Sequence, residues 1–175
     1  MKKAILFLAA AVSASSLIGA QVDWTAANLA GNTSSDDLTR YTIYFIQDTT
    51  TADVIAAIEG GTFDSLSNKS EGTITSKVNA RTGAVTYSAS GTATTSHTAA
   101  NGNYSSVLAM FTADGSSYTV MQKSAAVSEA TGKASFGFDN LGQSGTTTWA
   151  ATPEPASVAL LLLGVAAFGL KRKIA

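Results

Sequence analysis

The chain has 175 residues, and its 11 Lys and Arg against 12 Asp and Glu give a formal net charge of −1 at pH 7. It contains no cysteine, which excludes disulfides, thiol catalysis and thiolate metal sites. Apolar stretches near both ends raise the hydrophobic fraction to 45% and leave about 130 residues between them, the size of one domain.

The first twenty residues have the pattern of a secretory signal peptide. Lys2 and Lys3 form a short basic region, an apolar core runs from Ala4 to Ala14, and small residues follow. We expect export through the Sec machinery and cleavage after Ala20, with Gln21 as the new N-terminus. The alternative is an uncleaved N-terminal anchor, which the short apolar core and the small residues after it disfavour.

Residues 21–152 form the predicted ectodomain, whose 6 basic and 11 acidic residues give a net charge of about −5. This mildly acidic balance argues against nucleic acid or anionic lipid as partners, and it is compatible with neutral glycans. Thr, Ser, Gly and Ala crowd the segment between short apolar runs, which is typical of many short strands with turns. We therefore expect a mainly β ectodomain, an antiparallel sandwich with one short helix.

The best strand pattern in the first half of the ectodomain runs from Thr39 to Ile46. Apolar and aromatic residues occupy both faces of this run, so we expect both faces to be covered. Thr50 to Glu59 then shows apolar residues at helical spacing, with a threonine to cap the start and Gly60-Gly61 to end it. These signals predict the helix.

A pair of strands is predicted next, from Gly72 to Val78 and from Ala84 to Ser90. The side chains expected to point inward on this pair are Ile74, Val78, Val85 and Tyr87. From Gly91 to Asn103 the composition of Thr, Ala, Ser and Asn predicts a loop.

The clearest hairpin joins Ser105–Thr112 to Ser117–Gln122, because Asp114-Gly115 supplies the backbone freedom that a tight turn requires. Two shorter strands are expected near the end of the ectodomain, over Ala134–Phe138 and Thr146–Ala150. Trp149, in the second of these, is expected to be a core or edge aromatic.

Few residues of the ectodomain offer catalytic chemistry. The only histidine, His97, lies among Thr and Ser in a predicted exposed loop, and no G-x-S-x-G nucleophile elbow is present. Three acidic pairs could serve a glycosidase, but turns and a helix N-terminus explain them as well. These pairs are Asp36 with Asp37, Asp48 with Asp53, and Glu59 with Asp64. We therefore expect no enzymatic activity, no cofactor and no metal site.

Aromatic side chains could instead stack on sugar rings. The candidates are Trp24, Tyr87, Tyr104, Tyr118 and Trp149. Most of them fall on inward faces of predicted strands, which favours packing in the core. Trp24 and Tyr104 lie outside the firm strands and are the candidate exposed platforms of a carbohydrate-binding module, the alternative to a structural or interaction role.

The C-terminal stretch begins with Pro153-Glu154-Pro155, which stays out of helix and strand because each proline fixes φ and lacks an N–H. An uncharged run from Ala156 to Leu170 follows, with Leu160 to Leu163 supplying much of its insertion energy. As a helix it reaches roughly 22 Å, short for a membrane span, and a thinner bilayer can absorb the mismatch. Lys171, Arg172 and Lys173 then favour the cytoplasmic side.

A Pro-Glu-Pro motif, an apolar span and a basic end, in this order, resemble the PEP-CTERM protein-sorting signal. The resemblance implies that an exosortase-type membrane enzyme recognises Pro153, Glu154 and Pro155 and removes the tail. It also implies display on the surface or in the biofilm matrix of a bacterium that makes exopolysaccharide. The leading interpretation is an exported protein, briefly held in the inner membrane, with a structural or interaction role in that layer. The alternative is an ordinary single-pass anchor that makes the protein a permanent membrane-anchored adhesin.

Overall fold

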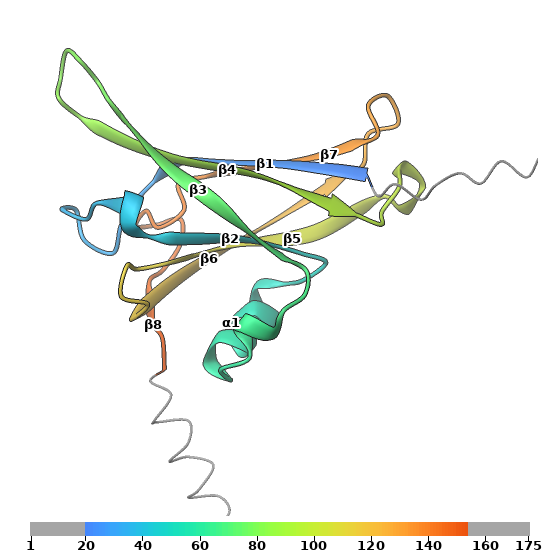
Figure 1. Ribbon diagram of the computed structural model, residues 1–175, viewed down its shortest axis with the longest axis horizontal. Helices are drawn as coiled ribbons and strands as arrows, with labels where there is room; N and C mark the ends of the chain where they lie inside the picture. The colour runs from blue at the N-terminus through green and yellow to red at the C-terminus, as the bar shows by residue number, and fades with distance from the viewer. Residues whose placement is uncertain (1–19, 154–175) are drawn as a thin grey trace, which may run out of the picture.

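The computed structural model describes residues 20–153 (Figure 1). The core of the predicted signal peptide, Glu154, Pro155, the predicted membrane span and the basic end lie outside the described residues. The elements in chain order are β1 (Ala20–Leu29), η1 (Leu38–Arg40), β2 (Thr42–Gln47), α1 (Thr51–Glu59), η2 (Phe63–Ser65), β3 (Lys69–Val78), β4 (Val85–Thr95), η3 (Ala99–Asn101), β5 (Asn103–Phe111), β6 (Ser117–Ala126), β7 (Lys133–Asp139) and β8 (Ala150–Ala151). Within residues 20–153, no helix is long and apolar enough to cross a membrane.

The strands form one eight-stranded sheet in the order β7-β1-β4-β3-β2-β5-β6-β8. Neighbouring strands are antiparallel except β1 and β7, which run parallel. Strand β3 joins the two halves of the sheet, because its first residues pair with β2 and its later residues pair with β4. The prediction of a mainly β fold with one helix is confirmed. The two layers, however, are halves of one curled sheet and not the separate sheets of a sandwich (Figure 1).

The curled sheet comes close to closing on itself where β6 turns into β7. An isolated bridge joins Val127 to Ala134, and the turn between them is held by the Ser128 N–H, which donates to the Lys133 carbonyl at 2.8 Å. The two strands share no further ladder in the described residues, so the sheet remains open. This arrangement places β1 and β7 across the core from β2, β5 and β6.

An aromatic cluster fills the space between the two halves of the sheet. Trp24 stacks on Phe45 with ring centroids 5.7 Å apart and an interplanar angle of 14°, and Phe45 contacts Phe136 at 5.2 Å. The indole lies against two glycines of neighbouring strands: a Cβ at Gly72 would lie 2.1 Å from Trp24 Cη2, and one at Gly91 would lie 2.7 Å from the ring. Glycine is therefore required at both positions to admit the ring.

Strand β1 was not predicted, although it lies between β4 and β7 and contributes Val22, Trp24 and Ala26 to the core. Its three Ala residues, Asp23 and Asn28 are poor strand formers, so local propensity gives only a weak signal. Its partner β4 extends through the first part of the predicted loop, because Gly91 to Thr95 pairs with β1. The loop prediction was wrong there, and long-range pairing decides the structure.

The second core lies on the outer face of β2, β5 and β6, under α1. Val54 and Ile58 of the helix are buried there against residues such as Ile46 and Val107. The helix begins after Thr50, so the predicted threonine cap is confirmed, and Thr50 also forms a capping box with Asp53. Ile43 and Phe45 belong to the inner cluster while Ile46 belongs to the outer one, so the prediction that both faces of β2 are covered is confirmed.

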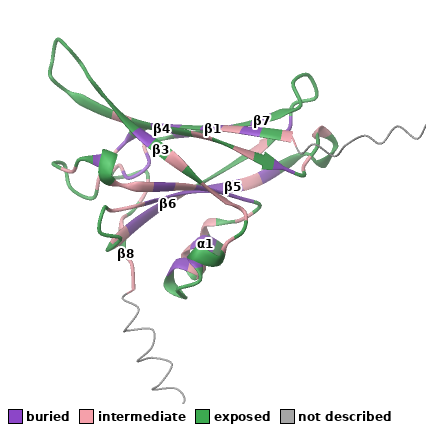
Figure 2. Ribbon diagram, viewed as in Figure 1, coloured by how far each residue is buried: buried purple, intermediate pink, exposed green. Residues whose placement is uncertain are grey.

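The outer half of the β3–β4 hairpin projects beyond the sheet (Figure 1). Strand β3 pairs with β2 only as far as Gly72, and β4 pairs with β1 only from Tyr87 onward, so the outer residues pair with each other alone. The prediction that Val78 and Val85 point inward was therefore wrong, because the two residues are 61% and 47% exposed. The outer half of the hairpin is exposed along its length (Figure 2).

The β5–β6 hairpin confirms the strongest strand prediction, with Asp114-Gly115 in its turn and Gly115 at φ +71°. Strand β7 confirms the expected strand near Ala134–Phe138. The last predicted strand, Thr146–Ala150, was wrong in extent, because only Ala150 and Ala151 pair with β6.

Candidate functional site

The segment that leads into the Pro-Glu-Pro motif is fixed to the edge of the sheet. Ala150 pairs with Tyr118 and Ala151 pairs with Ser117 of β6. One residue later, the Thr152 N–H donates to the Ser116 carbonyl at 2.8 Å. Few residues therefore separate the sheet from the predicted recognition sequence.

Trp149 anchors the chain just before β8. Its Nε1–H donates to the Gly142 carbonyl at 3.2 Å, and its ring meets Tyr41 edge-on with centroids 5.8 Å apart. Gly142 has φ +85°, and a Cβ there would lie 2.0 Å from the Ala30 carbonyl oxygen, so only glycine fits. The prediction that Trp149 is a core or edge aromatic is confirmed, because it packs against the inner cluster.

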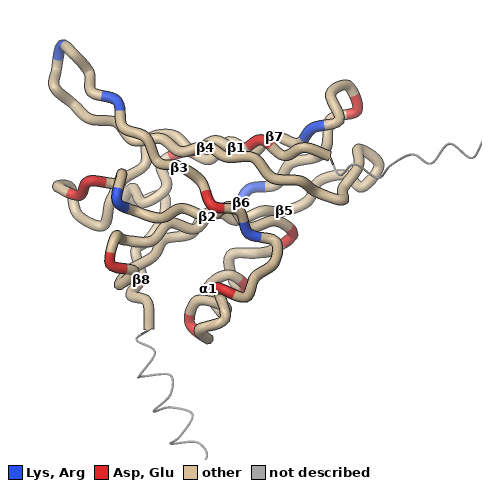
Figure 3. Tube along the Cα trace, viewed as in Figure 1, with Lys and Arg blue, Asp and Glu red and all other residues tan. Residues whose placement is uncertain are grey.

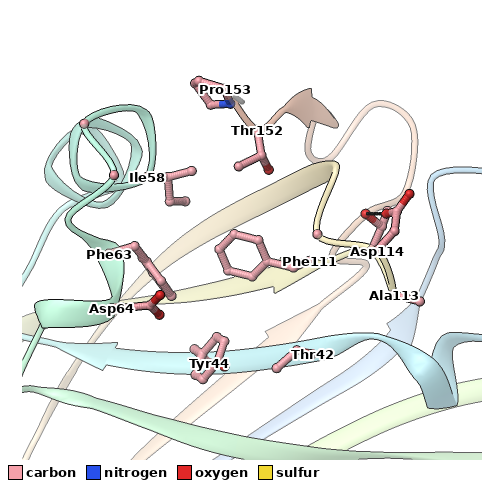
Figure 4. A pocket seen from close by; sticks show the side chains of 14 residues that line it. Thr42, Tyr44, Ile58, Phe63, Asp64, Phe111, Ala113, Asp114, Thr152 and Pro153 are labelled. Carbon is pink, nitrogen blue, oxygen red and sulfur yellow. Dashed lines mark hydrogen bonds between the residues drawn. The ribbon is translucent and has the colours of Figure 1, made fainter. Parts of the chain in front are cut away.

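A groove of about 790 Å³ lies beside this segment on the outer face of the sheet (Figure 4). Its walls are the end of α1, the β5–β6 turn and the start of the tail. Three aromatic rings form its floor: Phe63 contacts Phe111 at 5.0 Å and Tyr44 at 5.5 Å between centroids. Thr152 and Pro153 line the groove, so the first proline of the motif is part of its wall.

The groove carries charge as well as aromatic surface. Lys69 Nζ lies 4.8 Å from the centroid of Phe63 and 5.4 Å from that of Tyr44, and it pairs with Asp64 Oδ1 at 3.1 Å. Burial raises the pKa of Tyr44, with smaller contributions from the charges of Glu71 and Asp64. The tyrosine therefore stays neutral and presents a ring and a hydroxyl.

Asp114 forms the acidic rim of the groove in the β5–β6 turn. Its Oδ1 accepts hydrogen bonds from Thr112 Oγ1 at 2.7 Å, from Ser116 Oγ at 2.8 Å and from the Ser116 N–H at 3.0 Å. These donors, the Thr112 hydroxyl first, lower the pKa of Asp114 to about 2. The carboxylate is therefore ionised and fixed at the mouth of the groove.

His97 lies in a loop as predicted, but it is not a free exposed side chain. Its Nε2–H donates to Asp48 Oδ1 at 2.5 Å, and its ring stacks on Tyr104 with centroids 4.2 Å apart. Asp48 adopts φ +51° directly after β2, which turns its carboxylate toward the histidine. This contact could not be predicted from the sequence, because 49 residues separate His97 from Asp48.

The prediction that Trp24 and Tyr104 are exposed sugar-stacking platforms was wrong, because the two residues are only 1% and 7% exposed. Trp24 lies in β1, which was not predicted, and Tyr104 lies at the start of β5 beneath His97. Tyr118 is buried in the outer core, and Tyr87 packs against the inner one. In the groove, Tyr44 and Phe111 are partly exposed, whereas Phe63 is buried.

The acidic pairs have structural partners within the described residues. Asp36 accepts from Thr33 and Tyr41, and Asp37 caps η1 through the Thr39 N–H, which lowers the pKa of both carboxyls. Asp53 belongs to the capping box of α1, and Glu59 lies near the Tyr118 hydroxyl. Among residues 20–153, no three acidic or histidine side chains are grouped as a metal site would require.

The predicted signal cleavage site adjoins the fold directly. Ala20 pairs with Thr95, and Gln21 pairs with Thr94 on one side and Lys133 on the other. A chain that starts at Gln21 therefore keeps all but one of the paired residues of β1.

The C-terminal tail is the part of the chain that matches a family model. Residues 151–173 match the family model of the PEP-CTERM protein-sorting motif. This match covers the Pro-Glu-Pro sequence, the predicted span and the basic end, and it implies an exported protein that is transiently anchored at the membrane and processed by an exosortase. No curated protein and no solved structure matches the chain.

Proposed function

Because the chain carries a PEP-CTERM sorting motif, we propose that an exosortase delivers its ectodomain to the cell surface or extracellular matrix. There the ectodomain has a structural or interaction role in the exopolysaccharide layer, without enzymatic activity. Export uses the Sec machinery and removes the signal peptide after Ala20. The motif supports the sorting part of this proposal, and the shape of the ectodomain supports the interaction part.

The observation that carries the interaction role is the projecting β3–β4 hairpin. Val78 and Val85, which pair with each other near its end, expose apolar side chains far from either core. Strands that project from a sheet with exposed apolar side chains mark a contact surface, because such groups gain free energy when a partner covers them.

The charge of this hairpin differs from that of the rest of the ectodomain. It carries Lys77 and Arg81 and no acidic residue between Gly72 and Ser90, in an ectodomain that is acidic overall (Figure 3). A basic end with apolar flanks suits an acidic polysaccharide, whose carboxylates attract the cations while its ring faces cover the valines.

The experiment is co-sedimentation of the full chain with the host's purified exopolysaccharide. We expect Lys77→Gln with Arg81→Gln to weaken binding several-fold and to abolish most of its salt dependence. The matched control is Lys123→Gln, an exposed cation on β6. Binding that is unchanged in the double variant, or equally weakened in the control, would refute the role of the hairpin.

The alternative of a carbohydrate-binding module that stacks sugar rings on Trp24 and Tyr104 loses its support, because both residues are buried. The adhesin alternative keeps the tail in the membrane permanently. It shares the same ectodomain and differs only in the fate of the residues after the motif.

A further inference from the structure

Few residues separate the folded ectodomain from the motif that the enzyme recognises. Trp149 is anchored by its contacts with Gly142 and Tyr41, and only residues 150–153 separate it from Glu154. Even if β8 were released, these four residues would span at most about 14 Å when fully extended. With β8 in place, Pro155 lies no more than two residues, or about 7 Å of chain, beyond Pro153. An enzyme bound to the motif must therefore touch the ectodomain.

The surface that it meets first is the groove, because Pro153 forms part of the groove wall. The floor of Tyr44, Phe63 and Phe111 is apolar, and the acidic groups Asp64 and Asp114 stand at its edge (Figure 4). Thr152 Oγ1 is buried beside the groove and has no hydrogen-bond partner among the described residues. These features are continuous with the sequence that the enzyme recognises.

We infer that the groove is a docking surface for the exosortase-type enzyme, which inserts an apolar side chain flanked by a cationic group while it binds the motif. This inference rests on the proposed sorting function and extends recognition from the tail to the folded ectodomain. The apolar group covers the aromatic floor, and the cation meets the ionised Asp114, since Asp64 is already paired with Lys69. Recognition then depends on a correctly folded ectodomain as well as on the Pro-Glu-Pro sequence.

The test fills the groove without disturbing the core. Ala113 lines the groove in the exposed β5–β6 turn, so Ala113→Trp places an indole in the path of the enzyme. The matched control is Ala126→Trp at the exposed far end of β6. The full chain is co-expressed with its processing enzyme, and the tail-free fraction is followed by intact mass. We expect Ala113→Trp to slow processing about ten-fold or more, and Ala126→Trp to leave it unchanged.

A second variant separates loss of docking from obstructed access to the motif. A flexible linker of about ten Gly and Ser residues between Thr152 and Pro153 frees the motif from the ectodomain. We expect Ala113→Trp to remain slowly processed with this linker, because freeing the motif does not restore the lost docking contact; full restoration would show that the indole only obstructs access to the motif and would overturn the inference. Normal processing of Ala113→Trp without the linker, or equal slowing in both tryptophan variants, overturns the inference.

A disulfide tests whether β8 must detach first. The chain has no cysteine, so Ser117→Cys with Ala151→Cys introduces one cross-link between directly paired residues. Docking on the assembled groove predicts equal processing of the oxidised and reduced forms, whereas a block in the oxidised form alone shows that β8 peels away and overturns the inference. The unmodified chain reports separately on sorting, because its failure to be processed would contradict the proposed function itself.

Discussion

At the scale of single residues, the fold depends on how closely one indole approaches its neighbours. Trp24 occupies the space that side chains at positions 72 and 91 would fill, and it stacks on Phe45 in the middle of the core. Glycine in a strand normally weakens it, and the sequence accordingly predicted a loop from Gly91, whereas Gly72 was predicted to begin a strand. The structure shows the physical reason for both glycines, which is the volume of the ring.

This packing predicts that Gly72→Ala destabilises the protein. The new Cβ would lie 2.1 Å from Trp24 Cη2 in a closely packed core, and such overpacking costs about 1–3 kcal/mol or more of unfolding free energy. Urea denaturation measures the loss. The control is Gly137→Ala on β7, where a Cβ meets nothing within 4 Å and should be neutral or stabilising. Equal stability of the two variants would show that the indole does not lie against position 72.

A second prediction at this scale concerns acid stability. The hydrogen bonds to Asp114 lower its pKa from 3.8 to about 2, so the folded state favours the ionised form. The resulting stabilisation is present above pH 3.8 and is lost as the pH falls through about 2. We expect the Asp114→Asn variant to lose this part of the pH dependence of stability. The measurement is the change in unfolding midpoint between pH 4 and pH 2, which should be smaller in the variant than in the unmodified protein. A carboxyl resonance of Asp114 that titrates near its ordinary pKa would contradict this prediction.

At the scale of elements, the sequence predicted those whose signals are local. Helix α1 has its capping threonine and terminal glycine, and the β5–β6 hairpin has Asp114-Gly115 between alternating apolar residues. Strand β1 and the end of β4 were missed because Ala, Gly and Asn have little strand propensity, and only pairing between distant segments makes them strands. The groove was missed for the same reason, since it combines the end of α1, a turn and the start of the tail.

The projecting β3–β4 hairpin yields an element-scale prediction. Its outer half packs on neither core, so replacing residues 77–86 by a two-residue Asn-Gly turn should change the unfolding free energy by less than about 1 kcal/mol. Thermal or urea unfolding of the shortened chain measures this difference. A large loss of stability would show that the hairpin supports the fold and is not a free contact surface.

At the scale of the whole molecule, one curled sheet carries the two proposed contact surfaces on different elements. The projecting hairpin is basic, while β8 leads into Thr152 and Pro153, which line the aromatic groove (Figures 1 and 3). The tail could be identified from the sequence because its order of motif, span and basic end is local. That Thr152 and Pro153 line the groove required the three-dimensional structure, because β8 pairs with residues more than 30 positions earlier in the chain.

We propose that the membrane anchor is temporary and is removed at the Pro-Glu-Pro motif. The most direct measurement is the intact mass of the protein recovered from cells that contain the processing enzyme, with Pro153→Ala combined with Pro155→Ala as the control. We predict a mature species that lacks Lys171–Lys173 and the preceding apolar run, and a control that stays full-length at its C-terminus and membrane-bound. A mature protein that retains Lys171–Lys173, or a control that is processed normally, would show that the anchor is not removed at this motif.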